Sequence, residues 1–308
     1  MTTRLYRSTD VGAPVMEYAV GALNAVLKAC LVDGYGALPA AGWSHEVADA
    51  ATNRAAFVQG TVPTNPFNRK IYVRDNEEVT AGMAFVAACS AYTPGASPVF
   101  KEVMCSFNQP NWSTILKTAQ SAGAIAEWFI VADSRTFLLA VKRHEWKGCG
   151  WGMFIAGDYP SPYAKDYGAF AISGRYDGNT AVPIGTPAID PYIHQTGMFG
   201  DTAGVYAYAS MTNDLEMGTG TTMGIQNYGF AYNSPEILLT RRIVGEGYKQ
   251  RARVPFIWKP LAPVGYFSPG ALPDGFEFTM ATGEVLKYLY TSSDGWEGRL
   301  FVQIGGFD

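Results

Sequence analysis

Cys30 and Asp33 stand together where an apolar segment breaks into the glycine-rich sequence GYG. A thiol beside a carboxylate could belong to a nucleophilic site, which needs a base within hydrogen-bond reach of the nucleophile. The neighbouring sequence supplies no histidine for that role. We therefore interpret the break as a packed helix end, where Gly34 and Gly36 supply positive φ and Trp43 folds back to cover it.

Three aspartates near predicted strand ends are the residues best placed for acid–base chemistry, namely Asp133, Asp158 and Asp166. Aromatic residues such as Trp128 and Tyr159 lie near them, as they would at a site for sugars. Glycoside hydrolysis needs two carboxyl groups roughly 5 to 10 Å apart, a separation that sequence spacing does not reveal. A structural turn explains each aspartate better, with sugar hydrolysis and passive surface binding of sugar as alternatives.

The histidines and cysteines argue against a metal site. The four cysteines are far apart with no C-x-x-C pair, and the three histidines, His45, His144 and His194, are isolated from one another. The sequence GTGTTMG has the wrong glycine spacing for a dinucleotide loop, and no nucleotide-binding or hydrolase motif is present. We predict no catalytic residue, no cofactor and no metal, and therefore a protein that is not an enzyme.

Arginines crowd the segment RRIVGEGYKQRAR, although the whole chain has a formal net charge of −4. That balance argues against a nucleic-acid protein, because nucleic-acid binding needs a net basic field. We interpret the segment as a solvated or partner-facing strand pair, with contact to a nucleic-acid backbone as the alternative. Its Arg251 and Arg253, together with Trp258, Tyr35 and Trp43, are the candidates for assembly or packing.

Composition indicates a well-filled core and a weakly charged surface. Apolar residues make up 48% of the 308 residues and charged residues only 16%, against roughly 25% in ordinary soluble domains. A well-packed β-rich domain and a surface covered by partners explain this equally well. The N-terminus has no apolar core of an export signal, and the run Val15–Val32 is too polar for a membrane span.

Two helices are predicted. The first is a long buried helix between Pro14, suited to a first helical turn, and Gly34, suited to the position after a helix end. Its polar residues form one narrow stripe, so most of its circumference must be covered. The second is a shorter helix from Pro110 to Gly123, which Gly123 would close.

The rest of the chain predicts antiparallel sheet. Hairpins are expected across Asp133–Arg135 and across Thr282–Gly283. No strand alternates with a long helix, so the predicted class is α+β, predominantly antiparallel β in a sandwich or layered sheet. One large domain is preferred, with the main body over residues 1–262 and a C-terminal hairpin region packed on it over 263–308. Strands are predicted over 55–60, 70–75, 82–92, 127–133, 136–143, 150–159, 167–176, 204–211, 236–244, 276–281, 285–291 and 299–306.

The chain also resembles a family of uncharacterised bacteriophage virion-associated proteins. The resemblance runs in order from residue 5 to about residue 262, through the N-terminal stretch and then NRAAFVQG, EWFIVADSRTFLLAV, GMFIAGDY and RARVPFIWKPL. Glu17 and Tyr18 depart from it where the family has small residues, and 92–126 matches less well. The N-terminal match lies in Ser8, Gly12, Ala13, Pro14, Cys30, Leu31, Val32, Gly34, Tyr35, Gly36, Gly42 and Trp43.

This resemblance implies a structural virion protein assembled in the bacterial cytoplasm. A tail, baseplate or neck component is expected to bind other copies of itself and other phage structural proteins. The alternatives are a capsid decoration protein and a tail protein that binds or depolymerises a host surface glycan.

Overall fold

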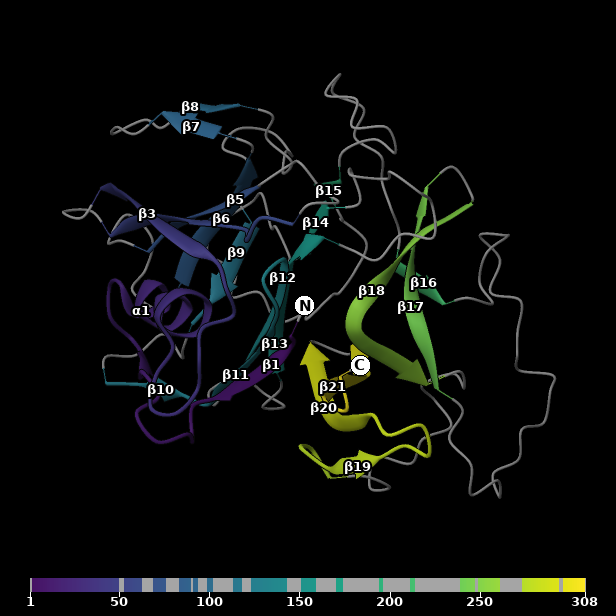
Figure 1. Ribbon diagram of the computed structural model, residues 1–308. Coiled ribbons are helices and arrows are strands. Elements are labelled where there is room, and N and C mark those ends of the chain that lie inside the picture. The colour runs from purple at the N-terminus through teal and green to yellow at the C-terminus, as the bar shows by residue number, and fades with distance from the viewer. Residues whose placement is uncertain are drawn as a thin grey trace.

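The protein is an α+β structure in which antiparallel sheet dominates, shown in Figure 1 as a computed structural model. Every ladder among the strands that the structure describes is antiparallel, which confirms the predicted class. The structure describes residues 2–49, 53–62, 69–75, 83–89, 91–93, 99–101, 113–117, 123–142, 151–158, 170–173, 194–195, 211–213, 239–246, 249–260, 273–293 and 296–307.

The strands form three main sheets. The central sheet has, in spatial order, β1 (Arg4–Arg7), β11 (Trp128–Ala132), β12 (Thr136–Lys142), β13 (Trp151–Asp158), β14 (Phe170–Ser173) and β15 (His194–Gln195). The N-terminal sheet has β3 (Ser44–Asp49), β4 (Arg54–Val58), β5 (Lys70–Arg74), β6 (Met83–Cys89) and β9 (Ser113–Leu116). The C-terminal sheet has β16 (Met211–Asn213), β17 (Leu239–Glu246), β18 (Lys249–Pro260), β21 (Trp296–Gly305), β20 (Val285–Ser293) and β19 (Glu277–Thr279).

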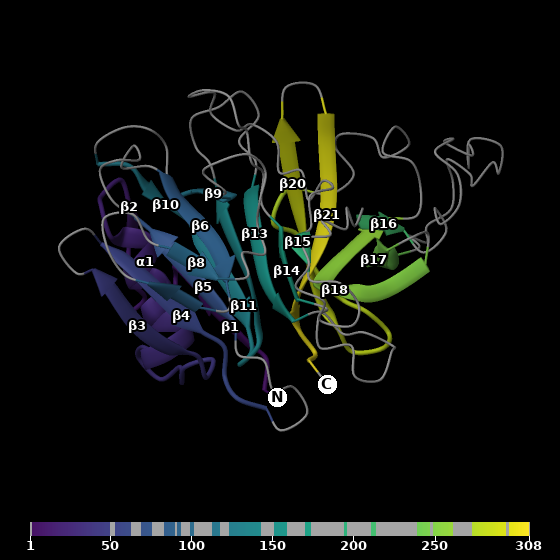
Figure 2. The ribbon, with the colours of Figure 1, turned by 90° about the horizontal axis from the view of Figure 1, so that it is seen from above.

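Two short ribbons and one helical unit complete the described fold. The ribbons pair β2 (Met16–Glu17) with β10 (Ile125–Ala126) and β7 (Ala91–Thr93) with β8 (Val99–Lys101). The helical unit is α1 (Ala22–Lys28), continued by the π-helical turn η1 (Ala29–Asp33). Figure 2 shows the N-terminal sheet and the helix on one side of the central sheet and the hairpin β20–β21 on the other.

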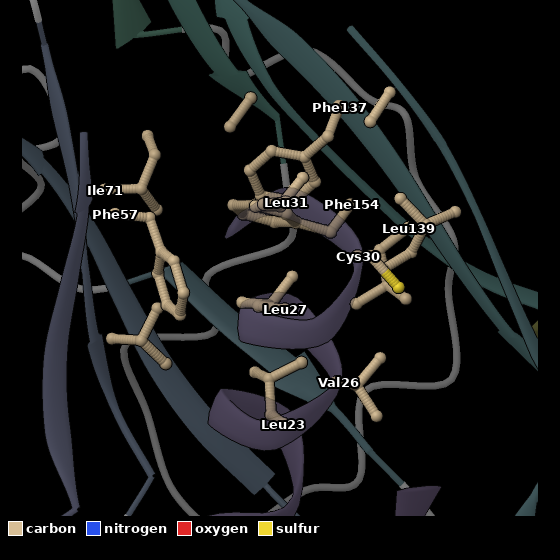
Figure 3. Close-up of a cluster of buried hydrophobic side chains, with 14 of the residues drawn as sticks. Leu23, Val26, Leu27, Cys30, Leu31, Phe57, Ile71, Phe137, Leu139 and Phe154 are labelled. Carbon is tan, nitrogen blue, oxygen red and sulfur yellow. The ribbon is translucent and has the colours of Figure 1, made fainter. Parts of the chain in front are cut away.

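The first core lies between the central and N-terminal sheets, and the helix is held between them. Leu23, Leu27 and Leu31 point from the helix into this core (Figure 3). Around them the close-up shows Phe57 and Ile71 on the N-terminal sheet and Phe137, Leu139 and Phe154 on the central sheet. The two sheets thus cover the face of the helix that carries these leucines, while Ala25, Lys28 and Asp33 on the other face are exposed.

The second core lies on the opposite face of the central sheet. Its cross-strand row Val131, Leu138 and Ile155 packs with Leu289 and Val302 of the C-terminal sheet. Because successive strand residues point to opposite faces, β11 supplies both cores and is buried along its whole length. The central sheet is therefore the middle of three layers, which explains why β11 and β12 are apolar and buried along nearly their whole length.

The prediction of a long N-terminal helix is wrong. Met16 and Glu17 are in strand β2, and the helix begins at Ala22 and ends at Asp33. Gly21 precedes it with φ 84°, a left-handed conformation that interrupts a regular backbone. The residues before Gly21 obtain backbone partners from β10 instead, so strand pairing replaces the first predicted helical turns.

The end of the helical unit confirms the packed helix end. Cys30 is a buried free thiol, and the N–H of Gly34 donates to the carbonyl oxygen of Ala29 at 2.8 Å, closing the π-helical turn. Gly34 and Gly36 have φ values of 78° and 57°. The N–H of Trp43 then donates to the carbonyl oxygen of Leu31 at 2.9 Å, so the chain folds back over the helix end.

The prediction of a second helix, from Pro110 to Gly123, is also wrong for the residues that the structure describes. Ser113–Leu116 form strand β9, which pairs with β6, while 102–112 and 118–122 lie outside the described residues. This segment contains the β-branched residues Thr114 and Ile115, which suit a strand, and periodicity over so few residues does not separate the two structures.

Both predicted hairpins are confirmed. β11 pairs with β12 across Asp133–Arg135, and β19 pairs with β20 across the turn that contains Thr282 and Gly283. The arginine-rich segment is the hairpin β17–β18, a strand pair as predicted. The C-terminal strand β21 pairs with β18 in one sheet, so the C-terminal region shares hydrogen bonds with residues before position 262.

Candidate functional site

The aspartates that sequence analysis selected meet at one end of the central sheet. Asp133 begins the β11–β12 turn and Asp158 ends β13, while Gln59 and Gly60 approach from the end of β4. We call Gln59, Gly60, Asp133, Arg135 and Asp158 the Arg135 cluster. Asp166, the third candidate, lies outside the described residues.

Arg135 holds this cluster together. Its side chain is 2% exposed. Nε donates to Oδ2 of Asp158 at 2.7 Å, Nη2 lies 2.6 Å from the same oxygen, and Nη1 donates to the carbonyl oxygen of Gly60 at 2.8 Å. The guanidinium therefore links the central sheet to the residues that follow β4, using the planar donor geometry for which arginine suits buried ion pairs.

Gln59 completes the link. Its Nε2 donates to the carbonyl oxygen of Arg135 at 2.6 Å and to Oδ1 of Asp158 at 3.1 Å. Its Oε1 accepts a hydrogen bond from the N–H of Arg69 at 3.1 Å. Both oxygens of Asp158 thus accept hydrogen bonds from groups within the protein.

Asp133 caps its own turn. Oδ1 accepts hydrogen bonds from the N–H groups of Arg135 and Thr136 at 2.7 and 2.8 Å. Burial raises the pKa of Asp133, and these two N–H groups oppose that rise. The backbone carbonyl of Asp133 accepts a hydrogen bond from Nε1 of Trp43 at 2.7 Å. This is the structural turn that the sequence favoured.

The chemistry open to the Arg135 cluster is limited by these bonds. A glycosidase acid must reach the glycosidic oxygen, and its partner must face the sugar or a water. Here Asp158 faces Arg135 and Gln59, and Asp133 faces backbone N–H groups. The arrangement therefore favours a structural role, in which these bonds join the central sheet to the residues after β4, over acid–base catalysis.

Replacing Asp158 by Asn tests this interpretation. The change should lower the free energy of unfolding by about 1–3 kcal/mol, because the buried guanidinium of Arg135 loses its charged acceptor. Chemical denaturation measures this loss.

In parallel, the wild-type protein should release no reducing sugar or peptide from host cell wall or surface polysaccharide. Turnover that Asp158→Asn abolishes would identify an active site instead.

A second buried polar cluster lies at the start of the helix. Asp75 follows β5 and Lys117 follows β9, and the two form an ion pair with side chains 1% and 0% exposed. Lys117 Nζ also donates to the carbonyl oxygen of Ala19 at 2.6 Å. Burial raises the pKa of Asp75 and lowers that of Lys117, because each charged form is desolvated.

Asp75 caps the helix from another element. Its Oδ2 accepts a hydrogen bond from the N–H of Leu23 at 2.8 Å, while the N-cap residue Gly21 has no side chain to do so. Lys117 neutralises the carboxylate on its other oxygen. Sequence analysis missed this cluster. It placed the start of the helix at Pro14, whereas the helix begins after Gly21, a residue that cannot cap it with a side chain.

The five assembly or packing candidates fall in two places. Trp43 is buried, with its ring edge-on to Phe137, and the hydroxyl of Tyr35 donates to Oδ2 of Asp10 at 2.9 Å. Both therefore contribute to internal packing. The other three, Arg251, Arg253 and Trp258, are all in strand β18. The structure describes the backbone at these positions but not the side chains.

No metal site is found in the described part of the chain. It contains no cluster of three or more His, Cys, Asp or Glu side chains able to hold an ion. His45 packs on the ring of Phe57 with centroids 5.2 Å apart, and burial lowers its pKa. His194 lies in β15, and His144 lies outside the described residues. None of the described helices has the length and apolar character needed to cross a membrane.

Comparison with known proteins adds no relative: no protein-family model and no curated protein matches the chain.

Proposed function

We propose that the protein is a structural component of a bacteriophage virion, in the tail, baseplate or neck, and that it acts through assembly with copies of itself and with other phage structural proteins. A catalytic role forms no part of this proposal. The N-terminal resemblance to virion-associated proteins motivates it, and the low proportion of charged residues, 16% of the chain, suits a surface covered by partners.

One structural observation supports assembly over catalysis. Two ion pairs among the described residues, Arg135 with Asp158 and Lys117 with Asp75, tie separate parts of the fold together. Arg135 joins the central sheet to the residues after β4, and Lys117 with Asp75 joins two strands of the N-terminal sheet to the helix. Layers held rigidly in this way suit a building block, and the carboxylates of both ion pairs are already bonded to groups of the protein itself.

The test is to locate the protein in purified phage particles. Mass spectrometry should detect it at a fixed copy number, and labelled antibodies should bind the tail, baseplate or neck. Labelling of the capsid faces would support the alternative of a decoration protein. Absence of the protein from purified virions would contradict the proposal.

A further inference from the structure

The buried pair of Asp75 and Lys117 holds a carboxyl group and an amine in direct contact inside the protein. Lys117 Nζ donates to Oδ1 of Asp75, and the two side chains are 1% and 0% exposed. Burial favours the uncharged form of each group, as the raised pKa of Asp75 and the lowered pKa of Lys117 show. An uncharged, desolvated lysine has the lone pair that makes its amine a nucleophile.

The other hydrogen bonds of the pair suit attack of this amine on the carboxyl carbon. Nζ donates to the carbonyl oxygen of Ala19 at 2.6 Å, which fixes the position of the amine. Oδ2 of Asp75 faces the N–H of Leu23 at 2.8 Å and the N–H of Asn24 at 3.4 Å. Such an attack builds negative charge on one carboxyl oxygen, and N–H groups already directed at that oxygen stabilise the charge. Fixed contact between two reacting groups is itself worth an effective concentration of roughly 10⁵ M or more.

We propose that Asp75 and Lys117 condense to form an amide bond between their side chains. Nζ of uncharged Lys117 attacks Cγ of protonated Asp75, and Oδ2 takes the negative charge of the tetrahedral intermediate. A proton then passes from Nζ to Oδ1, which already carries one. The Cγ–Oδ1 bond breaks and Oδ1 leaves as water while the Cγ–Oδ2 double bond forms again. A carboxylic acid and an amine thus give an amide and one water, with no oxidant, reductant or other reactant.

The product keeps the partners that the reactants already have. The N–H of the amide would donate to the carbonyl oxygen of Ala19, and its oxygen, the former Oδ2, would accept from the N–H of Leu23. A buried ion pair bears the desolvation cost of both charges, whereas the amide is neutral. Condensation also releases a water from a site that is closed to solvent. These terms favour the amide in the folded protein.

The bond would cross-link the N-terminal sheet. Asp75 follows β5 and Lys117 follows β9, and these strands lie on either side of β6. The link would close a loop between residues 42 positions apart, which restricts the unfolded chain and stabilises the fold. This inference goes beyond the proposed function and does not depend on it, because the reaction needs only the folded chain.

Mass spectrometry of the intact, denatured chain tests the bond. The wild-type protein should be lighter than its sequence by the mass of one water. Protease digestion should yield a branched peptide in which Asp75 is joined to Lys117. Lys117→Arg keeps the positive charge but should have the full mass, because a guanidinium cannot be deprotonated to supply the lone pair. A wild type of full mass, with Asp75 and Lys117 recovered in separate peptides, would overturn the proposal.

A second route to the same mass change needs a control. An aspartate before a glycine can lose water by cyclising onto its own backbone, and Asp33–Gly34 is such a sequence. A deficit of one water that persists in Lys117→Arg would therefore overturn the cross-link. Lys28→Ala removes an exposed lysine beside Asp33 and should keep the deficit of the wild type. If Lys117→Arg does not fold, the branched peptide of the wild type decides the question, because its presence supports the bond and its absence contradicts it.

Discussion

Replacing Leu27 by Asp is expected to lower the free energy of unfolding by about 4 kcal/mol or more. Leu27 is fully buried, and Figure 3 shows it pointing from the helix into the first core. A carboxylate there would be surrounded by apolar side chains such as Leu23, Leu31 and Phe57. It would have to stay protonated or force the two sheets apart.

The next residue supplies a matched control. Lys28 is exposed and pairs with Asp33, the two side chains being 46% and 50% exposed. An ion pair in water contributes little, so Lys28→Ala should cost less than about 1 kcal/mol. Urea denaturation of both variants separates the two positions. Equal stabilities would show that the face carrying Leu27 is not buried between the sheets.

The two hairpins were predictable because their signals are local. The β11–β12 hairpin is the clearest case: apolar runs flank a turn whose Asp133 bonds two N–H groups within three residues. The β19–β20 hairpin has Thr282 and Gly283 at its turn, and Gly283 has φ 100°. A turn of this kind depends on residues that are adjacent in the chain, so the sequence alone is enough to locate it.

The helix was misplaced because its boundaries are set by distant residues. Val15 to Val32 is apolar enough for a helix throughout. Pairing of Met16 with Ala126 and capping of Leu23 by Asp75 decide which part becomes helical, and these partners are 110 and 52 positions away. Tertiary contacts override local propensity here.

The candidate site was predictable only in part. Asp133 and Asp158 were selected from their places at strand ends, and the preferred interpretation of a turn holds for Asp133. Arg135 and Gln59 bring these aspartates into one cluster only because β12 pairs with β13 in the observed register and because the end of β4 lies beside them. Such long-range pairing has no signature in one sequence.

Replacing Lys117 by Met is expected to cost about 3–5 kcal/mol, because it leaves the carboxylate of Asp75 buried without its cation. The ion pair itself gives much less than this figure, since desolvation of both charges offsets their attraction. Chemical denaturation of the variant measures the cost.

A double-mutant cycle separates the pair from the cap. Asp75→Asn keeps an oxygen that can accept the N–H of Leu23 and removes the charge. The double variant Asp75→Asn with Lys117→Met should therefore be markedly more stable than the sum of the single losses predicts, by about 2 kcal/mol or more. Strict additivity would show that the two charges do not interact.

The pH dependence of the Lys117→Met variant gives an independent check. Burial already raises the pKa of Asp75 above its ordinary range, and loss of the cation should raise it further. A raised folded-state pKa means that the folded protein binds a proton more readily than the unfolded chain. The variant should therefore regain stability relative to wild type as the pH falls through this raised pKa, and should lose it as the pH rises. A difference that stays constant across this range would mean that Asp75 is not held in the buried position from which it caps the helix.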